Sequence, residues 1–198
     1  RIFRDYFERW FETFRTRTDY CMSEIFINHL KEMDDPRLKV MAQPSEADGE
    51  YRGGEHGYNS QNLPNMTNYS LIGTFYAGDP DGFSPFYKAC ETYFMMAEAA
   101  LNGWNVPMTA QEAYEKAVRL SMEDNEISTE ETEAYLAGKG KWDGTKGRLF
   151  FEQWVGLFKE CTEAWSFYRR TGYPTYIQTA VGSDGVTKQY PGAKSKWG

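Results

Sequence analysis

The stretch SPFYKACETYFMMAEAALNGW, Ser84 to Trp104, and the run TAQEAYEKAVRLSMED, Thr109 to Asp124, decide the fold. Ser84 followed by Pro85 predicts a helix start, because the hydroxyl can cap the helix and proline lacks an N–H at a position where none is needed. Gly103 predicts the end of this helix. Thr109 with Glu112 forms a capping-box pattern that opens a second helix. Two helices joined by a short turn predict an αα-hairpin.

Helical patterns also precede this pair. Ile2 to Arg17 places aromatic side chains on one stripe and charged ones on the other, which predicts an amphipathic helix. A second helix is predicted from about Tyr20 to Met33, ending before the turn Asp34-Asp35-Pro36. The run LKVMA, Leu38 to Ala42, is interpreted as a short strand.

Further helices are predicted towards the C-terminus. Ser128 with Glu131 forms another capping pattern, for a short helix that ends at Gly138. A last helical region begins near Thr145, with a break near Glu160 to Thr162, and ends at Gly172 and Pro174. The tail, 175–198, is rich in glycine and polar residues and is interpreted as irregular.

Between these helical parts, residues 43–84 change in texture to Gly, Asn, Ser, Asp, Pro and Tyr. Loops of this length in a compact domain are usually functional or disordered, and the interleaved tyrosines argue against disorder. We therefore expect a mainly α fold with long irregular ligand-binding loops and little β structure. The expected organisation is a single domain, 1–198, with a loop-rich ligand face at 43–84 and a helical scaffold at 85–174.

Composition narrows the function classes. The net charge is −7, and no cluster of Lys and Arg appears that would bind a nucleic-acid backbone. No apolar run approaches the roughly 20 residues needed to cross a bilayer. The chain opens at Arg1 without initiating Met or signal-peptide pattern, so we interpret it as a mature form or a fragment.

Sequence motifs of catalysis and metal binding are weak or missing. Three separated cysteines and two histidines make zinc and redox chemistry improbable, and Cys90 fits a small buried hydrophobe better. The cluster Asp79-Pro80-Asp81-Gly82 resembles the opening of a calcium loop, but an ordinary turn is favoured. Glu98 and Glu163 are expected to pair with Arg169 or Arg170. We predict no enzyme activity, no cofactor and no metal.

Aromatic residues are the most informative class, since 17% of the chain is Phe, Trp or Tyr. A Tyr or Trp ring stacks on the apolar face of a sugar while nearby amides satisfy its hydroxyls. The loop residues have this composition, and Trp142 stands in the polar loop GKGKWDGTKG. The candidate ligand contacts are Tyr51, Tyr58, Asn59, Tyr69, Tyr76 and, as second choice, Trp142.

Several runs, in this order, resemble the C-terminal part of the SusD/RagB family of nutrient-binding lipoproteins. They are MDDPRLKV, EYRGGEHGYN, FYKACETYFMMAEAALNGW, AYEKAVRLSMED, LFFEQWVGLF and TEAWSFYRRTGYP, and they cover the chain to about Pro174. The resemblance implies tetratricopeptide-like helix pairs, a position on the bacterial outer surface through a lipid anchor absent from this chain, and a TonB-dependent transporter of the SusC type as partner.

The resemblance also implies the ligand, which is an oligosaccharide or, in some members, a peptide. The expected function is non-catalytic glycan binding at the cell surface for delivery to the transporter. The alternatives are a peptide-binding member of the family, a tetratricopeptide-like protein-protein scaffold and a glycoside hydrolase fragment, which would need two acids facing one bond.

Overall fold

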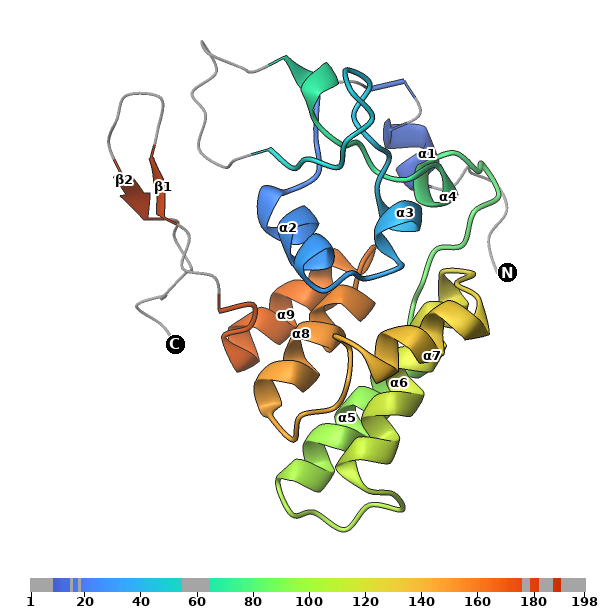
Figure 1. Cartoon of the computed structure of the whole chain (residues 1–198), viewed down its shortest axis with the longest axis vertical. Coiled ribbons are helices and arrows are strands. Elements are labelled where there is room, and N and C mark those ends of the chain that lie inside the picture. The colour runs from blue at the N-terminus through green and yellow to red at the C-terminus, as the bar shows by residue number, and fades with distance from the viewer. Residues whose placement is uncertain are drawn as a thin grey trace. The chain divides into compact units, whose positions relative to one another are not determined.

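The computed structural model describes residues 9–14, 16–17, 19–54, 65–175, 179–181 and 187–189. Within them the structure is mainly helical, as expected (Figure 1). In chain order the elements are α1 (Arg9–Phe14), α2 (Glu24–Glu32), α3 (Leu38–Met41), the 3₁₀ helix η1 (Met66–Asn68), α4 (Thr74–Ala77), α5 (Ala89–Leu101), α6 (Ala110–Asp124), α7 (Thr129–Ala137), α8 (Lys146–Gly156), α9 (Cys161–Thr171), β1 (Thr179–Val181) and β2 (Thr187–Gln189).

The described residues divide into two compact units. The first, here called the loop unit, comprises those up to Ser84 together with β1 and β2. The second, the helical unit, comprises those from Pro85 to Thr175. The single-domain organisation expected from the sequence stays a prediction.

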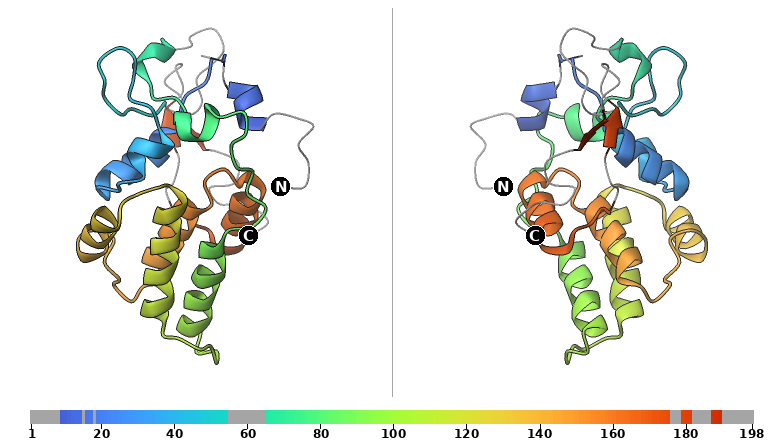
Figure 2. Two further views of the ribbon diagram at one scale, coloured as in Figure 1. Left: turned by 90° about the vertical axis from the view of Figure 1, so that its right-hand side faces the viewer. Right: turned by 90° about the vertical axis from the view of Figure 1, so that its left-hand side faces the viewer.

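The predicted αα-hairpin is present as α5 and α6, which lie side by side in both views of Figure 2. The Thr109–Glu112 capping box is confirmed, because the hydroxyl accepts from the backbone N–H of Glu112 at 3.2 Å and the carboxylate accepts in return. The predicted start at Ser84 is wrong. Helix α5 begins at Ala89, where the Glu91 carboxylate accepts from the N–H of Lys88 at 2.6 Å and so defines the first turn.

Small residues let α5, α6 and α8 approach closely in the core of the helical unit. Fully buried alanines lie on both α5 and α6, and the ring of Phe94 on α5 lies next to Gly156 on α8. A side chain at Gly156 would bring its Cβ to 3.1 Å from the Phe94 ring. Cys90, also fully buried, is confirmed as a small core residue, and burial raises the pKa of its thiol to about 12.

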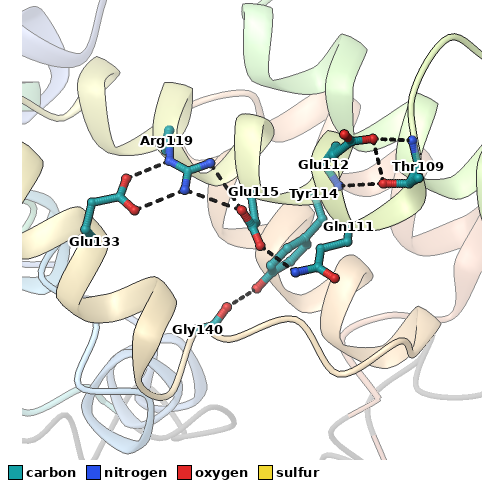
Figure 3. A network of polar contacts seen from close by, with 8 residues as sticks. All are labelled: Thr109, Gln111, Glu112, Tyr114, Glu115, Arg119, Glu133 and Gly140. Carbon is teal, nitrogen blue, oxygen red and sulfur yellow. Dashed lines mark hydrogen bonds and ion pairs between the residues drawn. The ribbon is translucent and has the colours of Figure 1, made fainter.

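A polar network joins α6 to α7 (Figure 3). The Arg119 guanidinium pairs with Glu133 of α7 at 2.6 Å and lies 3.4 Å from Glu115, one turn back on α6. The hydroxyl of Tyr114, whose side chain is buried, donates to the carbonyl of Gly140 at 2.6 Å. Because α6 and α7 are joined by a short turn, these bonds fix the angle at which the third helix leaves the pair.

The last helical region is broken, as the sequence predicted, but the break covers 157–160 and so lies slightly before the predicted Glu160 to Thr162. Gly172 has φ +74°, a left-handed conformation that glycine adopts easily, and it ends α9 as expected. Arg170 on α9 forms a two-point ion pair with Glu98 on α5, with N–O distances of 2.6 and 2.8 Å. This confirms the structural interpretation of Glu98.

In the loop unit, a buried ion pair follows α2. Asp35 and Arg37 are both inaccessible to solvent, and their closest N–O distance is 2.6 Å. Asp35 also accepts from the backbone N–H of Arg37 at 2.9 Å, which fixes the predicted turn. The expected strand over LKVMA is wrong, because this turn leads directly into α3, and only Ala42 pairs in the manner of a strand, with Ile72.

The ends of the chain differ in part from the predictions. Helix α1 lies inside the predicted amphipathic segment, whose first seven residues, 2–8, fall outside the described ones. The tail is not wholly irregular, since β1 and β2 pair antiparallel with Thr179 opposite Gln189. The β-branched residues around Gly-Ser-Asp-Gly form a hairpin pattern that the prediction overlooked. None of the described helices has the length and apolarity that crossing a bilayer requires.

Candidate functional site

The described parts of the predicted loop region are held by backbone hydrogen bonds rather than left free. Gly54 pairs with Met22 and Glu24, through N–H groups and carbonyls at 2.8 and 3.0 Å. Ser70 accepts from Met22 and donates to Arg52, at 2.8 and 2.7 Å. Backbone hydrogen bonds therefore connect three segments that are distant in sequence. This backbone frame positions the side chains of the segments.

Glycine is required where these segments touch. A Cβ on Gly53 would lie 2.4 Å from the backbone of Glu24, and one on Gly54 would lie 2.4 Å from the Cys21 sulfur. Neither contact is sterically possible without moving the backbone or the thiol. The glycines that suggested a loop in the sequence thus serve close packing of extended segments.

A cavity of about 570 Å³ lies between residues 43–46 and 65–71 of the loop unit. Its two walls are joined at both ends, by the N–H of Gln43 to the carbonyl of Leu71 at 2.8 Å and by the N–H of Ala47 to the carbonyl of Thr67 at 3.0 Å. The volume is in the usual range for small-molecule sites. The described lining residues are Gln43, Pro44, Ser45, Glu46, Asn65, Met66, Thr67, Tyr69 and Leu71.

Two amide side chains of the lining are held in place. The Gln43 amide donates to the carbonyl of Ile72 at 2.7 Å, and the Asn65 side-chain oxygen accepts from the N–H of Thr67 at 3.2 Å. Side chains already anchored in this way lose little freedom when they bind a ligand. The cavity therefore offers fixed polar atoms beside the apolar surfaces of Met66, Tyr69 and Leu71.

A series of polar side chains, connected by hydrogen bonds, supports the 43–46 wall of the cavity. The buried Ser45 donates from its hydroxyl to Asp48 at 2.5 Å, and Asp48 pairs with Arg52 at 2.8 Å. Arg52 also donates to the carbonyl of Asn68, at 2.8 Å. The hydrogen bonds from Arg52 and then Ser45 hold the pKa of Asp48 well below its usual range, so this carboxylate stays ionised.

The predicted ligand contacts are not all brought together. Tyr69 lines the cavity, whereas Tyr51 is half-buried and does not. Tyr58 and Asn59 lie outside the described residues. Tyr76 is only 2% exposed and packs against Phe75 and Phe83, with ring centroids 5.2 and 6.0 Å away. Its prediction as a ligand contact is corrected, because a ring inside an aromatic cluster has no free face.

Trp142 belongs to the helical unit and is not among the described lining residues. The sequence suggested that it had little to pack against. Its ring centroid is in fact 4.8 Å from that of Tyr114, which supports part of its surface, while part stays accessible. A role in ligand binding stays a prediction for this residue.

Sequence reasoning missed most of the lining. It singled out aromatic residues, but the cavity also uses Gln43 and Glu46 from the start of the loop region and Asn65 from its middle. The available signal was that the runs 43–46 and 64–67 each combine a proline with polar residues. Only the pairing of these two runs across the backbone frame makes them one site.

The acidic cluster after α4 forms an ordinary turn. The Asp79 carboxylate accepts from the N–H of Asp81 at 2.8 Å, and its carbonyl accepts from the N–H of Gly82 at 3.1 Å. This confirms the favoured interpretation. In the part of the chain that the structure describes, no group of His, Cys, Asp and Glu side chains is arranged to hold a metal ion.

Comparison with known proteins places the chain in a family. Residues 3–191 match the model of a SusD-like family described as starch-binding and associating with the outer membrane. The chain therefore belongs to this SusD-like family. None of the curated proteins matches its sequence.

Solved structures of SusD-like proteins resemble the chain. One, from Bacteroides thetaiotaomicron VPI-5482, is 28% identical, with a TM-score of 0.65 over 78% of this chain and 38% of its own. A chitin-binding SusD homologue from Flavobacterium johnsoniae is 26% identical, with a TM-score of 0.67 over 81% and 38%. A SusD homologue from Bacteroides vulgatus ATCC 8482, at 21% identity and TM-score 0.74 over 87% and 41%, shows the shared fold alone. The chain spans about two-fifths of the length of these structures.

Proposed function

We propose that the chain binds a glycan without catalysis at the surface of the bacterial outer membrane, for delivery to a TonB-dependent transporter of the SusC type. The observation that carries the proposal is the cavity of the loop unit, with the ring of Tyr69 beside two anchored amides. The description of the family as starch-binding and the chitin-binding homologue support the same ligand class.

The proposed binding mode is stacking combined with hydrogen bonding. The ring of Tyr69 covers the apolar face of a sugar, and Met66 and Leu71 extend this apolar surface. The remaining amide atoms of Gln43 and Asn65 bond hydroxyl groups. Tyr51, Tyr58 and Asn59 remain proposed further contacts in the loop unit, and Trp142 remains the second-choice contact in the helical unit.

Removing the ring of Tyr69 tests this mode. In isothermal titration calorimetry with maltohexaose and chitohexaose, we expect Tyr69→Ala to lower the affinity for the bound oligosaccharide by about three- to tenfold, the worth of one aromatic contact. Tyr69→Phe keeps the ring and should stay close to wild type. Trp104→Ala, at a 69% exposed aromatic of the helical unit, is the matched control and should change nothing.

The outcomes separate the alternatives. Wild-type affinity in Tyr69→Ala would place the glycan outside this cavity. Binding of peptides in place of both oligosaccharides would favour a peptide-binding member of the family. Release of reducing sugar from starch or chitin would contradict the non-catalytic proposal and favour a glycoside hydrolase fragment.

The cellular part of the proposal has its own test. A protein held by a lipid anchor on the outer face of the membrane should be digested by protease added to intact cells of the source bacterium. It should also copurify with a TonB-dependent transporter from detergent-solubilised outer membranes. Protection from protease in intact cells would overturn the proposed location.

A further inference from the structure

The charges around the cavity of the loop unit define which glycans it can accept. Among its described lining residues, Glu46 is the only one with a charge at neutral pH. Glu46 is exposed, so its carboxylate is open to solvent in the absence of ligand.

Arg52 does not offset this charge. It is linked to Ser45 of the lining through Asp48, and its guanidinium is paired with Asp48 at 2.8 Å. Asp48 keeps its negative charge at neutral pH, because Arg52 and Ser45 hold its pKa well below the usual range. Arg52 and Asp48 together have no net charge, so this pair leaves the charge of Glu46 unbalanced.

A single carboxylate has two consequences for a glycan ligand. It accepts hydrogen bonds from sugar hydroxyls, and such charge-assisted bonds are stronger than those of a neutral acceptor. It also repels a carboxylate or sulfate group on the ligand, by an amount that falls as salt is added. Both effects act at the same residue and favour the same ligand class.

We propose that Glu46 is the specificity-determining residue of the cavity, selecting neutral glycans and rejecting polyanionic ones such as uronate or sulfated oligosaccharides. This inference rests on the proposed function, since it takes the cavity to be the glycan site. It assigns the charge class of the ligand to one named residue of the cavity.

The test uses matched ligands that differ only in charge. Maltohexaose and chitohexaose are each compared with the same oligosaccharide after oxidation of its primary alcohols to carboxylates. For the oligosaccharide that binds, we expect the whole chain to prefer the neutral form by about tenfold in low salt, the effect of roughly one close charge–charge contact at high dielectric. At 0.5 M salt the preference should shrink to less than about threefold.

Two variants assign the preference to Glu46. Glu46→Gln keeps the shape but removes the charge, so the preference for the neutral form should fall to within about twofold, with a modest loss of neutral-ligand affinity. Glu50→Gln is the matched control. Glu50 is an equally exposed carboxylate four residues away and outside the described lining, so the preference should persist.

The result that overturns the inference differs from the one that overturns the proposed function. If neither neutral oligosaccharide binds, the glycan function itself is wrong. If a neutral oligosaccharide binds but its oxidised form binds as tightly, or if Glu46→Gln keeps the full preference, the glycan function stands and the role of Glu46 is wrong.

Discussion

At Gly140 the packing of the helical unit depends on a missing side chain. A Cβ there would lie 2.2 Å from the ring of Tyr135, which is buried and donates its hydroxyl to Glu152. We expect Gly140→Ala to lower the free energy of unfolding by about 1–3 kcal/mol, because the ring must move inside a packed core. Urea denaturation followed by circular dichroism measures this loss.

Gly147 offers the matched control for Gly140. It lies inside α8, and a Cβ there would meet nothing nearer than the Tyr173 hydroxyl at 3.5 Å. Gly147→Ala should raise the free energy of unfolding by about 0.5–1 kcal/mol, since alanine is the better helix former. Equal losses in both variants would contradict the packing argument.

Glu91 makes the stability of the helical unit depend on pH. It lies at the start of α5, near Lys88 and Glu160, and Lys88 pairs with Glu160 at 2.9 Å. Burial, reinforced by the neighbouring Glu160, raises the pKa of Glu91 from 4.5 to about 7. The folded protein therefore binds this proton more tightly than the unfolded chain does.

The raised pKa fixes the sign of the pH effect. Its stabilisation is fully present below about pH 4.5 and is lost as the pH rises through about 7. We expect the free energy of unfolding to fall by roughly 2 kcal/mol across this window, and Glu91→Gln, which cannot ionise, to remove most of that fall. Urea titrations at pH 5 and pH 8 measure it. If the free energy of unfolding of Glu91→Gln falls with pH as steeply as that of the wild type, the effect belongs to another group.

At the scale of elements, the N-terminal caps of helices contribute measurably to the free energy of unfolding. Thr109 caps α6 with its hydroxyl and binds Glu112 in return. We expect Thr109→Ala to lower the free energy of unfolding by about 1 kcal/mol, the usual loss for an N-cap. Thr129→Ala, at an exposed threonine in the first turn of α7, should cost less than half as much. Equal melting temperatures for the two variants would show that the capping box contributes little.

Helix ends were predictable where the signal is local. The pairs Thr109–Glu112 and Ser128–Glu131 and the glycine at 172 place their own bonds within a few residues. The run LKVMA was mispredicted because a short apolar stretch fits a strand or a helix equally, and the ion pair of Asp35 with Arg37 decides the direction of the chain there. The start of α5 was misplaced because its true cap is the less conspicuous pair Lys88 and Glu91.

The site was predictable as a region but not as a set of residues. Composition pointed to 43–84, and Tyr69 was identified within it. Tyr76 was chosen by the same criterion yet is buried among aromatic rings, since composition does not say which face a tyrosine covers. Gln43 and Asn65 became neighbours only through backbone pairing of segments more than twenty residues apart, and no local pattern records such pairing.

At the scale of the whole molecule, the proposed function assigns ligand binding to the loop unit and a scaffold role to the helical unit. All described residues that line the cavity belong to the loop unit, while the helical unit has its own core of fully buried side chains on α5, α6 and α8. A core of this kind needs no contribution from elsewhere in the chain. Folding and binding should therefore be separable by truncation.

We expect residues 85–175, expressed alone, to fold and to have no affinity for the oligosaccharide that the whole chain binds. Circular dichroism should show helix with one cooperative thermal transition. Within this fragment Leu149→Ala, which removes a fully buried side chain from α8, should lower the free energy of unfolding by about 2–5 kcal/mol, whereas Lys146→Ala, at an exposed position of the same helix, should cost far less. Two results would contradict this division. A fragment that melts without cooperativity would show that the helical core depends on the loop unit. A fragment that binds the oligosaccharide as the whole chain does would place the ligand on the helical unit.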